Sequence, residues 1–331
     1  MNPRYSVVIP VYNRPDEVDE LLHSLCGQTY QNFEVVVVED GSAIPCKLVV
    51  EKYAEMLDVH YFEKPNSGPG QTRNYAAERS RGEYLLILDS DCILPETYLA
   101  AVEAELQREH ADAFGGPDRA HDSFSDVQKA INYAMTSFFT TGGIRGGKKK
   151  MDKFYPRSFN MGVRAEVYKA LGGFSAMRFG EDIDFSIRIF KGGYRCRLFP
   201  EAWVWHKRRT DLKKFFKQVH NSGIARIDLY KKYPESLKLV HLLPAVFTVG
   251  VVLVLLAAFI CPWSLLLLAL FAVIIFIDAS IRNKSIKIGA LSVIAAFIQL
   301  TGYGSGFLRA WWKRCICGGK SFSAFEKTFY K

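Results

Sequence analysis

Three long apolar stretches late in the chain restrict its fold more than any other feature of the sequence. They cover residues 242–260, 263–281 and 288–308, and only the second contains a charged residue. A helix of about 20 apolar residues is long enough to cross a bilayer, where backbone groups find no water to bond. The sequence therefore predicts a membrane region of two to three helices over residues 239–310. A buried hairpin of a soluble protein is the alternative, which these lengths disfavour.

The third apolar stretch is the least regular of the three. Its second half contains Gln299 and several glycines, which suit a lipid-facing helix poorly. A complete third crossing would also place Lys313 and Arg314 outside, against the positive-inside rule. We expect this stretch to span, to bend, to lie at the interface, or to pack against the first two. A basic tail, 311–331, follows.

Residues 1–238 have the pattern of a soluble α/β domain. Short apolar runs alternate with amphipathic helical patterns, which predicts a parallel sheet with right-handed crossovers. The predicted strands cover residues 6–11, 33–38, 59–62, 84–88, 113–116, 157–163, 195–199 and 202–206. The predicted helices cover about 16–26, 47–56, 71–80, 96–109, 122–139, 165–171, 181–190 and 212–233. Ile183, Ile187 and Phe190 are expected to form the apolar face of the helix that they share.

Polar side chains follow three of the predicted strands. They are Asn13, Asp40, and the pair Asp89 and Asp91 after the apolar run 84–88. The carboxyl ends of parallel strands meet at the edge of the sheet where α/β proteins bind ligands. Two carboxylates there can share a divalent cation that holds a pyrophosphate. The alternative is a simple strand-ending turn, where Asp and Ser are common.

Net charge and cysteine content indicate which partners and which cellular compartment suit this chain. The net charge of +9 is accompanied by no nucleic-acid-binding motif, so anionic lipid and anionic substrate explain it better. Seven cysteines without paired spacing predict no disulfide framework. Since the N-terminus runs straight into a strand pattern, no signal peptide is expected. These features favour a protein whose soluble part lies in a reducing cytoplasm.

Several motifs occur in an order typical of one enzyme family. They are Val8-Ile9-Pro10-Val11-Tyr12-Asn13-Arg14, Glu39-Asp40-Gly41-Ser42, Asn66-Ser67-Gly68 with Arg73-Asn74, Asp89-Ser90-Asp91, Gly172-Gly173-Phe174 and Glu181-Asp182. Over about residues 4–235 the chain resembles the family 2 glycosyltransferases. The resemblance implies the GT-A fold, a Rossmann-like, mostly parallel sheet, and a nucleotide-diphosphate-sugar donor. A C-terminal α-helical membrane region would follow this domain.

The resemblance also assigns roles to single residues. Asp40 would recognise the nucleotide base, whereas Glu39 stands where the family commonly has aspartate. Asp91, helped by Asp89 and His206, would hold Mg²⁺ or Mn²⁺. The residues expected to bind the donor are Pro10, Tyr12, Asn13, Arg14, Asp40, Gly68, Arg73, Asp89 and Ser90. Three alternatives stay open: Asp89 facing the ribose, Arg73 holding an acidic residue instead of a phosphate, and a purely structural His206.

Asp182 matches the catalytic base of the family, with Glu181 beside it as a supporting carboxylate. The alternative is that both acidic residues only complement the helix dipole. No Ser-His-Asp order or Cys-His pair favours a covalent intermediate, so one displacement would invert the anomeric centre. The chain lacks the Gln-x-x-Arg-Trp signature of processive synthases, which favours transfer of one sugar.

Together these features predict a multi-pass enzyme of the bacterial inner membrane with a cytoplasmic catalytic domain, 1–238. The acceptor would be a lipid-linked glycan of cell-surface polysaccharide biosynthesis, or alternatively polyprenyl phosphate itself. A non-catalytic membrane scaffold that binds nucleotide sugar is the third alternative. The Gly- and Lys-rich segment 142–153 is expected to be mobile, and either to close over the donor or to touch lipid headgroups.

Overall fold

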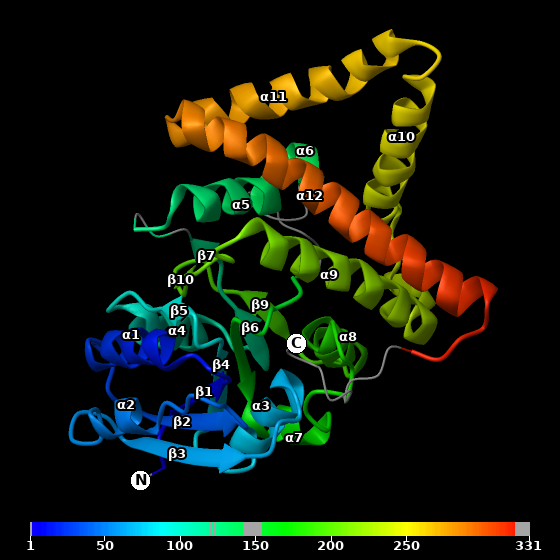
Figure 1. Cartoon of the computed structure of the whole chain (residues 1–331). Helices are drawn as coiled ribbons and strands as arrows, with labels where there is room; N and C mark the ends of the chain where they lie inside the picture. The colour runs from blue at the N-terminus through cyan, green and yellow to red at the C-terminus, as the bar shows by residue number, and fades with distance from the viewer. Residues whose placement is uncertain (1, 120, 122, 142–153, 322–331) are drawn as a thin grey trace. The chain divides into compact units, whose positions relative to one another are not determined.

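The computed structural model describes residues 2–119, 121, 123–141 and 154–321 (Figure 1). It consists of two compact units: a sheet unit of residues 1–121 and 151–206, and a helical unit of residues 122–150 and 207–322. Each unit has hydrophobic clusters of its own. The predicted functional division into 1–238, 239–310 and 311–331 stays a prediction. The segment 142–153 lies outside the described residues.

A seven-stranded, mostly parallel sheet forms the centre of the sheet unit, in the order β3-β2-β1-β4-β8-β6-β9. Its strands are β1 (Tyr5–Val11), β2 (Phe33–Asp40), β3 (Val59–Lys64), β4 (Tyr84–Leu88), β6 (Ala113–Gly115), β8 (Asn160–Arg164) and β9 (Cys196–Leu198). β8 runs antiparallel to both of its neighbours, β4 and β6. The predicted α/β class and the parallel pairing of the first four strands are therefore confirmed.

Both faces of the sheet are covered, which explains why the central strands β1, β2 and β4 contain long apolar runs. Alternate residues of β1 and β2 enter two different cores: Val7 and Val35 join one, and Val8 and Val36 join the other. The covering helices are α1 (Pro15–Cys26), α2 (Lys47–Glu51), α3 (Pro69–Ala77), α4 (Tyr98–Arg108), α7 (Ala165–Ala170) and α8 (Glu181–Lys191). The sheet thereby carries its loops on a rigid, doubly packed base.

The predicted apolar face of α8 is only partly correct, because Ile187 is buried as expected but Phe190 is only partly buried. The structure buries Phe185 and Ile189 in the core, together with the polar Asp182 and Ser186. Ile183 remains only partly buried. The helix is thus rotated relative to the prediction, because both apolar sets have helical spacing and packing against the sheet selects between them.

A small second sheet was not predicted. Its order is β5-β10-β7, with β5 (Cys92–Ile93), β10 (Val204–His206) and β7 (Asp118–Arg119). β10 pairs antiparallel with β5, so that His206 lies opposite Cys92. Two-residue strands carry no apolar run that a sequence pattern could show.

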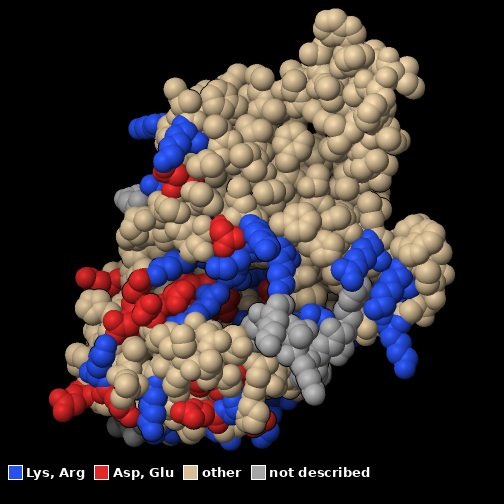
Figure 2. All heavy atoms as spheres, viewed as in Figure 1, with Lys and Arg blue, Asp and Glu red and all other residues tan. Residues whose placement is uncertain are grey.

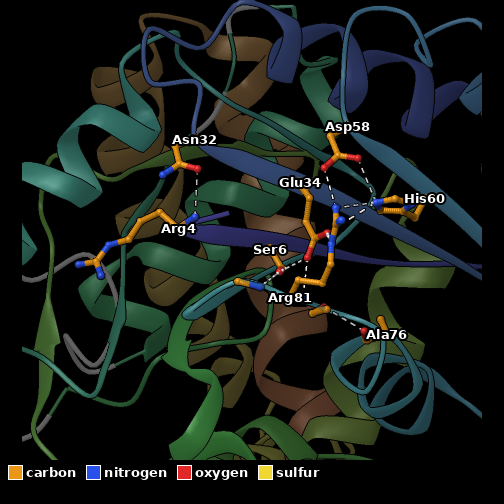
Figure 3. A network of polar contacts seen from close by, with 10 residues as sticks. Arg4, Ser6, Asn32, Glu34, Asp58, His60, Ala76 and Arg81 are labelled. Atoms are coloured by element: carbon orange, nitrogen blue, oxygen red, sulfur yellow. Dashed lines mark hydrogen bonds and ion pairs between the residues drawn. The ribbon is translucent and has the colours of Figure 1, made fainter. Parts of the chain in front are cut away.

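The amino-terminal edge of the sheet is closed by a polar network around Glu34, which is fully buried (Figure 3). Its Oε1 accepts hydrogen bonds from Ser6 Oγ (2.5 Å) and from the backbone N–H of Arg81 (2.6 Å). Its Oε2 accepts from Arg81 Nε at 2.6 Å, and Arg81 also pairs with Asp58. Burial alone would raise the pKa of Glu34, but these hydrogen bonds and the Arg81 charge lower it.

The helical unit contains six α-helices among the described residues. They are α5 (Asp126–Thr136), α6 (Phe138–Thr141), α9 (Leu212–Lys232), α10 (Leu243–Ala257), α11 (Leu265–Asn283) and α12 (Ile286–Trp311). The helix predicted over 122–139 is divided at Ser137, whose ψ of 142° is extended and interrupts the helical backbone. Three phenylalanines join the apolar helices: Phe247, Phe271 and Phe297 have ring centroids 5.1–5.8 Å apart.

Glycines let α12 approach its neighbours closely. A Cβ on Gly223 of α9 would collide with the carbonyl of Tyr303 on α12. Conversely, a Cβ on Gly306 would collide with the carbonyl of His220 on α9, and one on Gly304 with the carbonyl of Pro244 on α10. We call the contact of Gly223, Gly302 and Gly306 between α9 and α12 the glycine seam. It explains why the second half of α12 is poorly suited to face lipid: it faces protein.

In the described part of the chain, three helical segments are long and apolar enough to cross a membrane: Leu239–Ala257, Pro262–Asn283 and Ile286–Ile316. The first two are almost wholly exposed, whereas 39% of the apolar window of the third is buried. Figure 2 shows that the surface over α10 and most of α11 carries no charged side chains on the face in view. This exposed apolar surface indicates association with a membrane.

Candidate active site

Asp40, at the end of β2, holds the loop that leads into α3. Its Oδ1 accepts hydrogen bonds from Lys64 Nζ (2.6 Å) and the backbone N–H of Ser67 (2.9 Å), and its Oδ2 from the backbone N–H of Gly68 (2.9 Å). Gly68 has a φ of 90°, a conformation that favours glycine, and directly precedes α3. Asp40 thus shapes the entrance to the helix that carries Arg73.

Asn13 and Glu39 fix the neighbouring loop, 41–46. Asn13, at a φ of 54°, accepts hydrogen bonds from the backbone N–H groups of Ala43 (2.7 Å) and Ile44 (3.0 Å). Glu39 Oε2 accepts from the backbone N–H of Cys46 at 2.8 Å. A depression of about 350 Å³ lies beside this loop. None of the predicted site residues is among those that line it, which are Glu39, Gly41, Ser42, Pro45, Glu63, Lys64 and Pro65.

Asp91 lies between a histidine and an arginine. His206 Nε2 is 3.2 Å from Asp91 Oδ1, and Arg14 donates from a terminal nitrogen to Asp91 Oδ2 at 2.7 Å. The pairing of β10 with β5 brings His206 here, and Phe159 stacks on its ring at 4.7 Å. His206 Nδ1 is buried and has no hydrogen-bond partner in the part of the chain that the structure describes.

The neighbouring Cys92 is not equipped to bind a metal. It lies within 4.8 Å of the ligand atoms of Asp91 and His206. However, complete burial, with the charges of Asp91 and Asp89, raises the pKa of its thiol well above the usual range. Its Sγ–H instead donates to the carbonyl of Phe159. Because Mg²⁺ and Mn²⁺ prefer oxygen and nitrogen ligands to a thiolate, Asp91 and His206 are the ligands that this cluster offers to such an ion.

A second cluster within the described residues, Glu34, Asp58 and His60, has similar spacing. The guanidinium of Arg81 already lies among these side chains, at 2.6 Å from Glu34 and 2.7 Å from Asp58. Both oxygens of Glu34 already accept hydrogen bonds from Ser6 and Arg81. The cluster therefore belongs to the structural network of Figure 3.

Arg73 joins two acidic residues that are far apart in the sequence. One terminal nitrogen donates to Asp89 Oδ1 at 2.8 Å and the other to Glu181 Oε1 at 3.1 Å. The guanidinium also lies over the ring of Phe174, 5.2 Å from its centroid. These contacts correspond to the predicted alternative in which Arg73 holds acidic residues.

The turn Gly172-Gly173-Phe174 docks on α3 beside Arg73. Asn74 Oδ1 accepts from the backbone N–H of Phe174 (2.8 Å), and its Nδ2 donates to the carbonyl of the same residue (2.9 Å). Gly172 and Gly173 both have positive φ, 73° and 63°, which this turn requires. The turn leads into α8 and brings Glu181 to Arg73.

Glu181 and Asp182, in the first turn of α8, have different partners. Burial, followed by the charge of Asp182, raises the pKa of Glu181, although Arg73 opposes this effect. Asp182 Oδ2 pairs with Arg157 Nε at 2.7 Å. The sequence pattern places Arg157 at the start of a strand over 157–163, but β8 begins only at Asn160, and no motif marks this arginine as a site residue.

The structure thus gathers Asp89 and Glu181 on one arginine, and Asp91 with His206. The catalytic role of Asp182 and Glu181 and the metal role of Asp89, Asp91 and His206 stay predictions. The same holds for the donor-binding roles of Pro10, Tyr12, Asn13, Arg14, Asp40, Gly68, Arg73, Asp89 and Ser90.

Known proteins resemble the chain in sequence and in fold. The sequence profile of the family described as "Glycosyl transferase family 2" matches residues 6–172. A poly(ribitol-phosphate) beta-N-acetylglucosaminyltransferase, TarS of Staphylococcus aureus, is 37% identical over 113 residues, which are 33% of this chain and 20% of TarS. An uncharacterized glycosyltransferase of Haemophilus influenzae is 29% identical over 193 residues, 56% of this chain and 62% of that protein. Among these relatives, the chain spans at most 62% of the curated protein's length.

A solved structure shares the fold. The mannosyltransferase PcManGT from Pyrobaculum calidifontis, in complex with GDP-Man and Mn²⁺, superimposes with a TM-score of 0.66 at 20% identity. The superposition covers 94% of this chain and 88% of that one. The GT-A fold followed by long apolar helices is thereby confirmed, and with the profile match to residues 6–172 we conclude that the chain belongs to glycosyl transferase family 2.

Proposed function

We propose that the protein is an inverting glycosyltransferase that moves one sugar from a nucleotide-diphosphate-sugar to a lipid-linked glycan acceptor. The observation that carries this proposal is the bridge by Arg73 between Asp89 and Glu181, at 2.8 and 3.1 Å. It connects the acidic end of β4 with the acidic start of α8. The end of β4 is suited to hold a cation for the donor diphosphate, and the start of α8 is suited to supply a base. Family membership supports the reaction class.

The residues around Asp91 fit a divalent cation. Two ligands of one octahedral ion at about 2.1 Å lie about 3 Å apart, and His206 Nε2 and Asp91 Oδ1 are 3.2 Å apart. Asp91 and His206 would hold Mg²⁺ or Mn²⁺, with Asp89 as the further carboxylate. When bound, the ion would supply Lewis-acid stabilisation of the leaving diphosphate. The name of PcManGT, solved with GDP-Man and Mn²⁺, supports this assignment.

Asp182 would act as the general base. It would accept the proton of an acceptor hydroxyl while the oxygen attacks the anomeric carbon. The bond from that carbon to the diphosphate oxygen would break, and the nucleoside diphosphate would leave with the electron pair. One displacement inverts the anomeric centre, and the β product named for TarS is consistent with inversion.

The apolar helices α10 and α11 would hold the enzyme in the bacterial inner membrane with its sheet unit in the cytoplasm. A lipid-linked glycan in cell-surface polysaccharide biosynthesis would then be accessible as acceptor. Transfer directly to polyprenyl phosphate is the second candidate, favoured by the cationic Arg157 beside Asp182.

A panel of nucleotide sugars, offered with membrane lipid extract and either Mn²⁺ or EDTA, tests the proposal. We expect turnover with one donor, none in EDTA, and loss of both transfer and donor hydrolysis in Asp91→Ala and Asp182→Ala. Mass analysis of the lipid product separates a glycan acceptor from polyprenyl phosphate. Binding of Mn²⁺, followed by electron paramagnetic resonance, should weaken in His206→Ala independently of turnover. Turnover that EDTA leaves intact would overturn the metal assignment.

A further inference from the structure

Arg157 is held against α8 by its own neighbours in the chain. The ring of Tyr155 packs edge-on against Phe190, with centroids 5.0 Å apart. The carbonyl of Pro156 accepts a hydrogen bond from Ser186 Oγ at 2.8 Å. Because Ser186 and Asp182 are four residues apart on one helix, they share a face, and this anchoring places Arg157 beside Asp182.

Three arginines pair with the carboxylates of the candidate site. They differ in their exposure and in which guanidinium nitrogens are used for these pairs. Arg73 is only 4% exposed and uses both terminal nitrogens on Asp89 and Glu181. Arg14 uses a terminal nitrogen on Asp91. Arg157 is 37% exposed and meets Asp182 through Nε. No other partner of Arg157 occurs within the described ranges, so there its two terminal nitrogens remain available to a ligand beside the base.

A partly exposed guanidinium next to a carboxylate, with both terminal nitrogens available, is suited to bind a phosphoryl group. Two terminal N–H groups bind a phosphoryl group in a bidentate manner. Asp182 would repel such an anion unless a positive charge lay between them, and Arg157 lies there already. A neutral sugar hydroxyl would gain little from this charge.

We infer that Arg157 binds a phosphoryl group of the acceptor, so that the protein selects isoprenoid-phosphate-bearing acceptors over neutral glycosides. This inference rests on the proposed transferase function, because it places the acceptor beside Asp182. It assigns Arg157 to acceptor recognition, while donor binding stays with the residues around Asp91.

Binding of short probes to the full-length protein in detergent tests the inference. The probes are farnesyl phosphate, farnesol, inorganic phosphate, and the nucleoside diphosphate of the preferred donor. We expect farnesyl phosphate to bind about tenfold more weakly to Arg157→Gln than to the wild type, with partial recovery in Arg157→Lys. The matched control is Arg79→Gln, which removes a similarly exposed arginine, 32%, away from the candidate site. Nucleoside diphosphate should bind all four proteins equally.

The other outcomes overturn the inference. They are an equal loss of farnesol binding, a loss of nucleoside diphosphate binding, and inorganic phosphate binding the wild type as tightly as farnesyl phosphate. If Arg157→Gln does not fold, as judged by its thermal midpoint, the comparison is made with Arg157→Lys.

Turnover separates the two proposals. The protein could bind farnesyl phosphate through Arg157 but use no nucleotide sugar. That result would support the inference and contradict the proposed function. An active enzyme whose KM for a phosphate-bearing acceptor is unchanged in Arg157→Gln would sink the inference alone.

Discussion

At the scale of single residues, Arg73 connects two acidic parts of the candidate site that are far apart in the sequence. It is almost fully buried, lies over the ring of Phe174, and serves Asp89 and Glu181 at once. A lysine carries a single compact ammonium group and does not reproduce the planar fork that meets two carboxylates. The geometry at this point therefore requires arginine rather than positive charge alone.

We expect Arg73→Lys to lower kcat about 100-fold, because both carboxylates lose their positions. Arg73→Gln leaves two partly buried carboxylates without their shared cation and should cost about 1–3 kcal/mol of stability. Steady-state kinetics and thermal unfolding in detergent measure the two effects. Arg79→Lys, just beyond the end of α3, is the control and should behave like the wild type. A wild-type kcat in Arg73→Lys would contradict the bridging role.

The polar network at the other edge of the sheet gives a pH-dependent prediction. The pKa of Glu34 is lowered in the folded state, so its stabilising contribution is present above the unfolded pKa of about 4.3. It is lost as the pH falls through the folded value. Glu34→Gln should cost about 1–3 kcal/mol at pH 7.

The difference between wild type and Glu34→Gln should shrink as the pH is lowered from 7 towards 3.5. Thermal midpoints of both proteins across this range provide the measurement. A constant difference would mean that Glu34 contributes through its shape and not through its charge.

Sequence patterns identified most chemical groups of the candidate site but not how they pair. The acidic ends of β2 and β4 were predicted because each follows an apolar run. Arg157 was missed as a site residue, because the pattern placed it in a strand over 157–163, whereas it lies before β8, and no motif marks it. The orientation of α8 was predicted only in part, with Ile187 buried and Ile183 partly exposed, because Ile183 and Phe185 belong to two apolar sets with similar spacing. Pairing depends on helix rotation, which tertiary packing decides.

At the scale of elements, local sequence predicted the long strands and helices well. β1, β2 and β4 contain the predicted apolar runs, and α1 (Pro15–Cys26) begins within one residue of the predicted helix 16–26. β5 and β7 have two residues each, too few to form a pattern. Yet β5 positions His206, so the proximity of His206 to Asp91 depends on a pairing between segments over 100 residues apart, which sequence patterns do not reveal.

Replacing a glycine by alanine should have opposite effects on stability inside and outside the glycine seam. Gly to Ala inside a helix normally stabilises by about 0.5–1 kcal/mol. At Gly250 of α10 an added Cβ meets nothing within 4 Å, so Gly250→Ala should show this gain. At Gly223 the Cβ overlaps the Tyr303 carbonyl, so Gly223→Ala should cost about 1–3 kcal/mol.

Thermal unfolding of the two variants in the same detergent compares them directly. Equal shifts in the same direction would mean that α9 and α12 do not pack closely in solution.

At the scale of the whole molecule, both ends of α12 form ion pairs with other helices. Lys287, at its start, pairs with Asp126 of α5 at 2.7 Å. Arg314, just after its end, pairs with Asp228 of α9 at 2.9 Å. The lysine-rich α9 is unsuited to the bilayer core. We therefore expect α10 and α11 to cross the membrane and α12 to remain at the cytoplasmic interface.

Labelling of spheroplasts with an impermeant maleimide tests this topology. Cys261, between α10 and α11, and Cys317, after α12, are both exposed thiols. External label should be lost in Cys261→Ser and unchanged in Cys317→Ser, since only Cys261 would face outward. Loss of label in Cys317→Ser would show instead that α12 crosses.

The glycine seam also determines where the chain can be shortened. A fragment that ends at residue 238 would keep α9 but lose α12, leaving the glycine and Val219 surface of α9 open to water. We expect such a fragment to aggregate through this exposed apolar surface, although it would still contain every residue of the candidate site. Helix α12 is thus an internal partner of α9, and a soluble fragment without α12 would need a redesigned α9 surface.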